Sequence, residues 1–330
     1  MLTSINNEAV TLSPIAMGCW PIAGITSVDV TRDQSLATLR AAIDAGVTHF
    51  DTAYVYGYDG ESEQMVGEVL AELSPAKRDG VTVATKGGLI WGPPDPARPK
   101  AKRSQTRDAR PATLHAQCEE SLRRLRQDCV DVYYLHAPDP DVPLAESAGT
   151  IADLIAAGKV RFAGVSNFTD AAQYAAFAAE CPITLDQQPY NLRQRDIEAD
   201  RIPWAAAHDA YTVCYWPLMK GLLAGGLSRD HRFAARDSRQ HYAVFREPNW
   251  SAAHDLLDVL RDLAAPHRCT VAQLVLAWTI AQPGISAALC GAKRPEQITE
   301  TAAAMHVSLT AADLAAIEAA AAAAGPVVDV

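Results

Sequence analysis

The chain has 330 residues, of which 49% are hydrophobic and 21% are charged. This apolar content is enough for a large core and excludes a disordered or fibrous chain. The formal net charge of -10 argues against nucleic acid and anionic membranes as partners, although one basic cluster lies at 98–110. That cluster is either a solvated loop or a rim that attracts an anionic ligand, and its spacing does not decide between the two.

The cysteines and the first residues bear on the cellular compartment. The seven cysteines are scattered and never form a C-x-x-C pair, which argues against a disulfide framework and a zinc site. The first ten residues have neither the cationic start nor the apolar core of a secretory signal. We therefore expect reduced thiols, no metal and a cytoplasmic location.

Strand-like and helix-like segments alternate along the chain. The predicted strands are 14–18, 47–52, 81–85, 130–135, 160–165, 183–187, 211–216 and 285–290. The predicted helices are 33–45, 61–73, 112–127, 144–157, 170–180, 252–265, 270–281 and 310–324, with another directly after the last strand. Two long insertions, 89–111 and 218–250, are typical of lids or binding loops.

One uncharged stretch, 269–292, has roughly the length of a membrane span. The pair Pro283-Gly284 would break a spanning helix near its C-terminal third. A helix, a turn and a buried strand account for every signal in this stretch, so we expect no membrane segment here.

Eight strand–helix units predict an α/β fold, a closed (β/α)8 TIM barrel with long loops at its C-terminal face. The alternative is a doubly wound sheet, which for a nucleotide enzyme normally carries G-x-G-x-x-G after the first strand. Gly18 and Gly24 do not fit that motif. Because no Gly/Ser or Pro linker divides the chain, we expect one domain over 1–330.

Polar side chains follow successive predicted strands, where a barrel has its catalytic face. Asp51 and Tyr56 follow the second strand, Lys86 the third and His136 the fourth. One such residue alone is more often a surface residue or a cap, but four after such apolar runs indicate a common site. The fifth and sixth strands end in Ser166, Asn167 and Gln187.

These residue types suit proton transfer. A tyrosine hydroxyl, with a reference pKa of about 10, is a poor acid or base at neutral pH unless a cation stabilises its phenolate. We expect Lys86 to supply that charge, Asp51 to keep the ammonium protonated, and His136 to position a carbonyl oxygen or help carry the proton. The set predicts a general acid for a carbonyl group that accepts a hydride.

Seven motifs in this order resemble those of the aldo-keto reductases. They are "FDTAYVYG", "TKGG", "LHAPD", "GKVRFAGVSNF", "QQPYNL", "YWPLMKGLL" and "GAKRPEQITE", between residues 50 and 300. The sixth and seventh are most similar to a bacterial subgroup that includes an inositol-utilisation reductase. The resemblance implies an NADPH-dependent carbonyl reductase in which Tyr56 donates the proton and Asp51, Lys86 and His136 complete the tetrad.

The resemblance also implies where the cofactor binds. The nicotinamide carboxamide would be held by Ser166, Asn167 and Gln187, its ring would stack on Tyr215, and 217–222 would run along the pyrophosphate. The implied cofactor contacts are Trp20, Asp51, Ser166, Asn167, Gln187, Tyr215, Trp216, Pro217, Leu218, Gly221, Leu222, Gly291, Lys293, Arg294, Gln297 and Glu300.

Two cations open the helix after the eighth strand. Free N–H groups at a helix start attract anions, and adjacent cations strengthen this effect. Lys293 and Arg294 therefore suit a 2′-phosphate, which favours NADPH/NADP+ over NAD, unless they are surface cations without a role. For the substrate we expect contacts from Trp20, Tyr56, Trp91 and His136, although the tryptophans are as consistent with packing, and aromatic walls would suit sugar-like or ring substrates.

The leading hypothesis is an NADP(H)-dependent oxidoreductase for aldehydes, ketones or the matching alcohols, sugars and polyols included. The alternative is a cofactor-binding regulatory subunit of the same fold with little turnover, which the complete tetrad disfavours. A metal-dependent barrel hydrolase is a third reading, but His49, His115 and His136 do not make a plausible ligand set. We expect a monomer or a small homo-oligomer.

Overall fold

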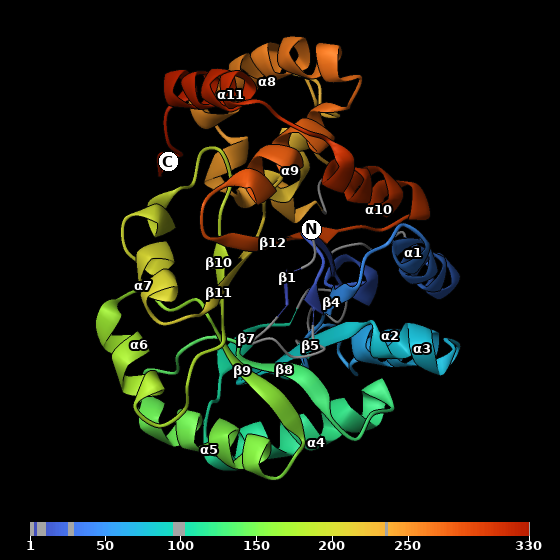
Figure 1. Ribbon diagram of the computed structural model, residues 1–330, viewed down its shortest axis with the longest axis vertical. Helices are drawn as coiled ribbons and strands as arrows, with labels where there is room; N and C mark the ends of the chain where they lie inside the picture. Colours follow the sequence, from blue (N-terminus) through green and yellow to red (C-terminus); the bar gives the residue numbers. More distant parts are fainter. Residues whose placement is uncertain (1–2, 5–10, 26–29, 95–102, 235–236, 330) are drawn as a thin grey trace.

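The computed structural model describes residues 3–4, 11–25, 30–94, 103–234 and 237–329. Eight parallel strands close into a barrel, and the last of them pairs with the first (Figure 1). In chain order they are β3 (Ile15–Gly18), β4 (His49–Asp51), β5 (Thr82–Gly87), β8 (Val130–Leu135), β9 (Val160–Ser166), β10 (Leu185–Pro189), β11 (Tyr211–Tyr215) and β12 (Ile285–Gly291). The predicted (β/α)8 barrel is confirmed, and all eight predicted strands are present.

Helices surround the barrel (Figure 1). They are α1 (Arg32–Asp44), α2 (Glu61–Ala71), α3 (Pro75–Asp79), α4 (Pro111–Leu125), α5 (Leu144–Ala156), α6 (Ala171–Ala178), α7 (Arg201–Ala207), α8 (Asn249–Ala264), α9 (Val271–Ala281), α10 (Pro295–Ala302) and α11 (Ala311–Ala324). Three of them begin with a capping box in which a threonine hydroxyl and a residue three positions later satisfy each other's backbone N–H groups. These boxes are Thr31 with Gln34, Thr270 with Gln273 and Thr310 with Asp313.

The barrel interior is filled by side chains. Its apolar cluster includes Ala84, Val132 and Tyr134 together with Leu12, which precedes β3 in the chain. Leu12 belongs to a short antiparallel hairpin of β1 (Thr3–Ser4) and β2 (Thr11–Leu12). Because Leu12 precedes the start of β3, it fills the amino-terminal end of the barrel and leaves the opposite rim for polar side chains.

The structure corrects several predicted boundaries. The insertion 89–111 contains an antiparallel hairpin of β6 (Leu89–Trp91) and β7 (Gln105–Arg107), while 95–102 lie outside the described residues. The insertion 218–250 contains 3-10 turns at 219–224, 238–241 and 243–245, and α8 starts three residues earlier than expected. The helices α3 and α7 were not predicted, because five and seven residues are too few to show helical periodicity.

The uncharged stretch 269–292 forms α9, a turn and β12, as predicted. Across the described part of the chain, no helix has both the length and the apolar character needed to cross a membrane.

Candidate active site

A buried ion pair joins the second and third barrel strands. The Lys86 ammonium donates to Asp51 Oδ1 at 2.5 Å and to the Thr52 carbonyl at 2.8 Å. The other carboxylate oxygen of Asp51 accepts from Gln187 Nε2 at 2.7 Å, across the barrel on β10. Lys86 and Asp51 are 0% and 1% exposed. Burial lowers the pKa of Lys86, and the Asp51 carboxylate opposes that shift.

Tyr56 lies directly above this pair, surrounded by rings. Its ring centroid is 5.1 Å from that of Trp20 and 5.9 Å from that of His136, both edge-on, and the Lys86 Nζ lies 5.0 Å from it. Burial, helped by the negative charge of Asp51, raises the pKa of Tyr56 well above its usual value. The stabilisation of the phenolate by the Lys86 cation stays a prediction, because burial and the Asp51 charge set the net direction of this shift.

The His136 ring is neutral at physiological pH. Burial, together with the nearby Lys86 charge, lowers its pKa well below the usual value. Its backbone N–H donates to the Gly87 carbonyl at 2.9 Å, which ties the residue after β8 to the end of β5. Among the described residues, its buried Nδ1 has no hydrogen-bond partner. A neutral imidazole beside Tyr56 suits hydrogen bonding to a polar substrate atom rather than charge stabilisation.

The loop that carries Tyr56 requires glycine at its turns. Gly57 and Gly60 have φ angles of +110° and +78°, which side chains other than glycine rarely adopt. A Cβ atom at Gly57 would lie 2.7 Å from the backbone nitrogen of Glu61, at the start of α2. The sequence between Asp51 and α2 thus folds into a tight turn that returns the Tyr56 side chain over the end of β5.

Four polar residues from the neighbouring strands form a second connected group. The Ser166 hydroxyl donates to the Gln187 carbonyl at 3.0 Å, and the Tyr215 hydroxyl donates to Asn167 Oδ1 at 2.8 Å. Asn167, with a φ of +61°, donates from Nδ2 to the His136 carbonyl at 2.9 Å and to Ser166 Oγ at 3.1 Å. The structure therefore brings all four together at the same rim as Tyr56.

The segment after β11 presents backbone and one exposed ring. Trp216 is 40% exposed with a φ of +59°, and the Lys220 ammonium lies 3.5 Å from its ring centroid. Gly221 has a φ of +91°, and a Cβ atom there would meet nothing within 4 Å. Leu218 is half-buried and Pro217 is buried. The Leu222 side chain is in the core at 0% exposure, so only its backbone is available for a ligand contact.

The predicted adenosine end lies at the start of α10. Lys293, Arg294, Gln297 and Glu300 are exposed there, and Gly291 is exposed at the end of β12. The Gln297 side chain accepts from the Lys293 backbone N–H at 2.8 Å. Nothing in the sequence indicated that Asp237, in the 218–250 insertion, lies near these residues. Arg239 chiefly, with a smaller effect from Lys293, lowers its pKa, which places this insertion near Lys293.

The two tryptophans predicted to line the substrate pocket differ in their contacts. Trp20 packs edge-on against the Tyr56 ring. The Trp91 indole N–H points into the loop that carries Tyr56 and donates to the carbonyls of Val55 (3.1 Å) and Gly57 (2.7 Å). Trp91 therefore contacts the backbone around Tyr56. Its ring also packs against that of Tyr58, with 5.0 Å between the ring centroids.

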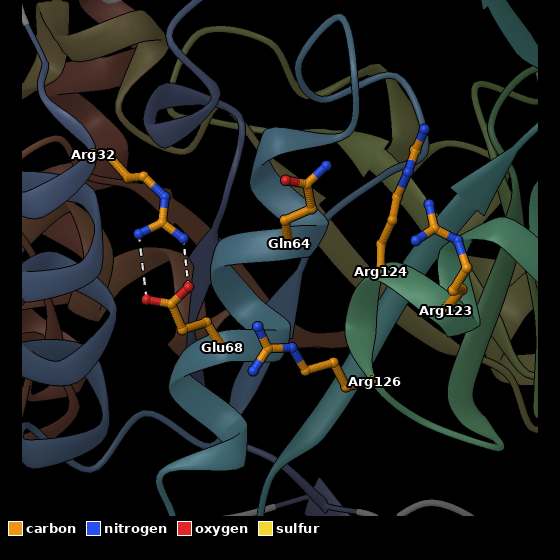
Figure 2. A pocket seen from close by; sticks show the side chains of 6 residues that line it. All are labelled: Arg32, Gln64, Glu68, Arg123, Arg124 and Arg126. Atoms are coloured by element: carbon orange, nitrogen blue, oxygen red, sulfur yellow. Dashed lines mark hydrogen bonds and ion pairs between the residues drawn. The ribbon is translucent and has the colours of Figure 1, made fainter.

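A pocket of about 310 Å³ outside the barrel contains none of the predicted site residues (Figure 2). It is lined by Arg32, Gln64, Glu68, Arg123, Arg124 and Arg126, from α1, α2 and the end of α4. Arg32 pairs with Glu68, and Arg124 extends from this pocket toward the Tyr56 loop (Figure 2). Within the described part of the chain, no group of three or more His, Cys, Asp or Glu side chains could hold a metal ion.

Sequence reasoning also missed a buried pair beside the active site. Arg124 on α4 pairs with Glu63 on α2 at 3.1 Å, and Glu63 is 0% exposed. A signal for Arg124 exists in the sequence, because Gln117, Ser121 and Arg124 follow helical spacing on the face that also buries Leu114 and Leu125. Polar residues on a buried helix face need partners inside the protein.

Comparisons with known proteins agree with the fold. Residues 14–322 match the model of the aldo/keto reductase family. The chain is 37% identical to the aldo-keto reductase YhdN of Bacillus subtilis (strain 168) over 298 residues, 90% of this chain and 86% of that protein. It is 30% identical to the NADH-specific methylglyoxal reductase of Escherichia coli (strain K12) over 310 residues, 92% of this chain and 93% of that protein.

A solved structure with the same fold also resembles this chain over nearly its whole length. The glycerol dehydrogenase AKR11B4 of Gluconobacter oxydans superposes with a TM-score of 0.88 at 35% identity, covering 97% of this chain and 95% of that one. The family match and these relatives span nearly all of both chains. The chain belongs to the aldo/keto reductase family, and it is an oxidoreductase that acts on carbonyl or alcohol groups with a nicotinamide cofactor.

Proposed function

We propose that the protein reduces the aldehyde or ketone group of small molecules with NADPH, and that Tyr56 donates the proton. The observation that supports this most strongly is the Tyr56 ring, which lies next to a buried Lys86–Asp51 pair and edge-on to the ring of His136. A neutral phenol holds the proton that a carbonyl oxygen needs when it becomes an alcohol. The other three members of the tetrad act on Tyr56 or on that oxygen.

Each side chain has a definite task in this mechanism. When bound, the reduced nicotinamide supplies a hydride to the carbonyl carbon. The Tyr56 hydroxyl donates its proton to the carbonyl oxygen, and the Lys86 ammonium, 5.0 Å from the ring centroid, stabilises the phenolate that remains. Asp51 holds the ammonium in place through its 2.5 Å contact. His136 donates a hydrogen bond to the same carbonyl oxygen and orients it toward Tyr56.

The protonation state of Tyr56 gives the rate of each direction its own pH dependence. Reduction uses the protonated phenol, which is the form that burial maintains. Oxidation of an alcohol needs the phenolate as base, so its rate should rise with pH until the phenol ionises. We therefore propose carbonyl reduction as the main activity near neutral pH, with alcohol oxidation at alkaline pH.

The polar residues of the rim fit a nicotinamide cofactor. Ser166, Asn167 and Gln187 offer amide and hydroxyl groups at one place, and Tyr215 presents a ring beside them. The open space at Gly221 suits the close approach of a pyrophosphate to the backbone. Lys293 and Arg294 support NADPH, because two exposed cations open α10 where a 2′-phosphate would be attracted. NADH is the second candidate, since the Escherichia coli relative is described as NADH-specific.

For the substrate we propose small polar carbonyl compounds, including sugars, and the matching polyols. Two relatives, a methylglyoxal reductase and a glycerol dehydrogenase, are named for small polar three-carbon compounds. Trp20 and His136 flank Tyr56 and would contact such a substrate. We also propose that the chain is one domain, a monomer or small homo-oligomer, and cytoplasmic, in line with its seven free thiols.

A steady-state panel tests this function. Aldehydes, ketones, sugars and polyols are each assayed with NADPH, NADH, NADP+ or NAD+ by following the absorbance of the reduced cofactor. We expect reduction of small polar carbonyls with NADPH at a higher kcat/KM than with NADH. Equal or better use of NADH would overturn the cofactor proposal, and turnover of none of these carbonyls or alcohols would overturn the proposed activity.

A further inference from the structure

The backbone around Tyr56 is held from outside by other parts of the molecule. Each of the four carbonyl oxygens of 54–57 accepts a hydrogen bond from a donor that lies beyond this segment. The bonds run from Arg124 Nη1 to Tyr54 (3.2 Å), from the Trp91 indole to Val55 (3.1 Å) and Gly57 (2.7 Å), and from the Ser62 N–H to Tyr56 (3.1 Å). A loop held at every carbonyl has little freedom to move the phenol that it carries.

Arg124 has other partners that hold its guanidinium in place beside the loop. Its side chain is 9% exposed and donates to Glu63 at 3.1 Å and to Glu120 at 2.9 Å. Its guanidinium also lies 4.6 Å from the Tyr54 ring centroid. In Figure 2 the side chain runs from α4 past Gln64 of α2, with its guanidinium far from that of Arg126. A planar group held at several edges is a rigid anchor for one more hydrogen bond.

The same network reaches the strand that carries Lys86. Glu63 accepts from the Thr85 hydroxyl at 2.6 Å, and Thr85 directly precedes Lys86 in β5. The backbone N–H of Tyr54 donates to the Lys86 carbonyl at 3.0 Å, while the Tyr54 carbonyl accepts from Arg124. Tyr54 is therefore bonded on both sides, to β5 through its N–H and to Arg124 through its carbonyl.

Trp91 also binds the loop. It lies on β6, whereas Arg124 lies on α4. Its single N–H lies within hydrogen-bond distance of two carbonyls, one on each side of Tyr56. A Trp N–H usually finds a partner where the ring is buried, and here both acceptors belong to the loop that carries Tyr56. The indole thus fixes the turn in which Tyr56 is the central residue.

We propose that Arg124 and Trp91 are positioning residues that clamp the backbone of 54–57 and so hold the Tyr56 hydroxyl at the reacting carbonyl. This inference rests on the proposed role of Tyr56 as the proton donor. A displacement of about 1 Å in a reacting group can lower a rate by about a hundredfold. Loosening either side of the clamp should therefore lower kcat while leaving the binding of substrate and cofactor largely intact.

The first test compares two neighbouring arginines that both pair with Glu120. Arg124→Lys keeps a charge beside Glu63 but loses the planar fork, and Arg123→Lys is the matched control, because Arg123 is 72% exposed and contacts Glu120 from the outside. We expect Arg124→Lys to lower kcat about tenfold or more, with KM and the cofactor dissociation constant within about twofold of wild type. Arg123→Lys should match wild type. Wild-type kcat in a folded Arg124→Lys variant would overturn the role of Arg124.

The second test separates clamping from lining the substrate pocket. Trp91→Phe removes the N–H and keeps an aromatic ring, so a clamp predicts a lower kcat at nearly constant KM. It also predicts a larger isotope effect with cofactor deuterated at the transferred position, because hydride transfer becomes rate-limiting. A raised KM with unchanged kcat and isotope effect would overturn the clamp and make Trp91 a pocket wall.

Tyr56→Phe is measured alongside these variants so that the two proposals fail separately. Retained turnover in Tyr56→Phe would overturn the proposed role of Tyr56. Lost turnover in Tyr56→Phe together with wild-type kcat in both Trp91→Phe and Arg124→Lys would overturn the clamp alone.

Discussion

The two sides of the barrel rim hold their polar groups in opposite ways. On the buried side, which comprises Asp51, Tyr56, Lys86 and His136, the charged groups are enclosed and paired. On the exposed side, which comprises 216–222 and 293–300, cations and backbone face outward and several residues have positive φ angles. A group that must transfer a proton needs a fixed position in a low-dielectric setting, whereas a surface that captures a soluble phosphate ester needs accessible donors and cations.

Substitutions on the buried side should lower stability and kcat more than those on the exposed side. The largest losses are expected at its ion pair. Lys86→Met leaves the Asp51 carboxylate enclosed without its cation, which costs about 3–5 kcal/mol of unfolding free energy. We also expect kcat to fall about a thousandfold, because no cation then stabilises the phenolate. Urea unfolding and steady-state kinetics measure the two effects.

The double variant Asp51→Asn with Lys86→Met is the control for that prediction. It removes the unpaired charge, so most of the lost stability should return while kcat stays low. Recovery of activity together with stability would contradict a catalytic role for the ammonium.

Acid should lower the free energy of unfolding through His49. This residue lies two positions before Asp51 on β4. Burial lowers the pKa of His49 to about 4, and among the described residues neither ring nitrogen has a hydrogen-bond partner. Below a pH of about 6.5 the unfolded chain binds a proton that the folded chain excludes, so the free energy of unfolding falls as the pH drops toward 4. Between about pH 7 and about pH 5 this loss is about 2 kcal/mol.

His49→Leu should remove that part of the acid sensitivity without loss of a hydrogen bond. Urea unfolding of both proteins at the two pH values gives the comparison. The same loss of stability in His49→Leu as in wild type would show that His49 is not its source.

The exposed side should respond more weakly and only through the cofactor. Lys293→Ala with Arg294→Ala should raise the dissociation constant of NADPH about tenfold and change that of NADH little, because only NADPH carries the 2′-phosphate. Fluorescence titration measures both constants, and kcat at saturating cofactor should stay near the wild-type value. Equal weakening of both cofactors would contradict the phosphate assignment.

The sequence predicted the buried side well because a charge inside an apolar strand is unusual. Asp51 and Lys86 stand out for that reason, and eight strands separated by helical segments fixed their common rim. The net direction of the Tyr56 pKa shift could not be deduced from residue types, because it depends on how the fold encloses the phenol.

Contacts made by helices and insertions were harder to predict. Arg124 and Glu63 lie on helices, where charged residues usually face water, so their pairing was visible only in three dimensions. Trp91 was expected at the substrate, and its N–H is directed into the loop from strand β6, which pairs with β7. The short helix α7 contains Pro203 and too few residues to show a period.

The central claim is that Tyr56 protonates the carbonyl oxygen as the hydride arrives. Single-turnover reduction by Tyr56→Phe, with the enzyme preloaded with NADPH and mixed rapidly with the best substrate of the panel, tests it directly. We predict an unchanged dissociation constant for NADPH and a rate of hydride transfer lowered about a thousandfold or more. A rate within about tenfold of wild type would contradict the claim, because a phenylalanine has no proton to give.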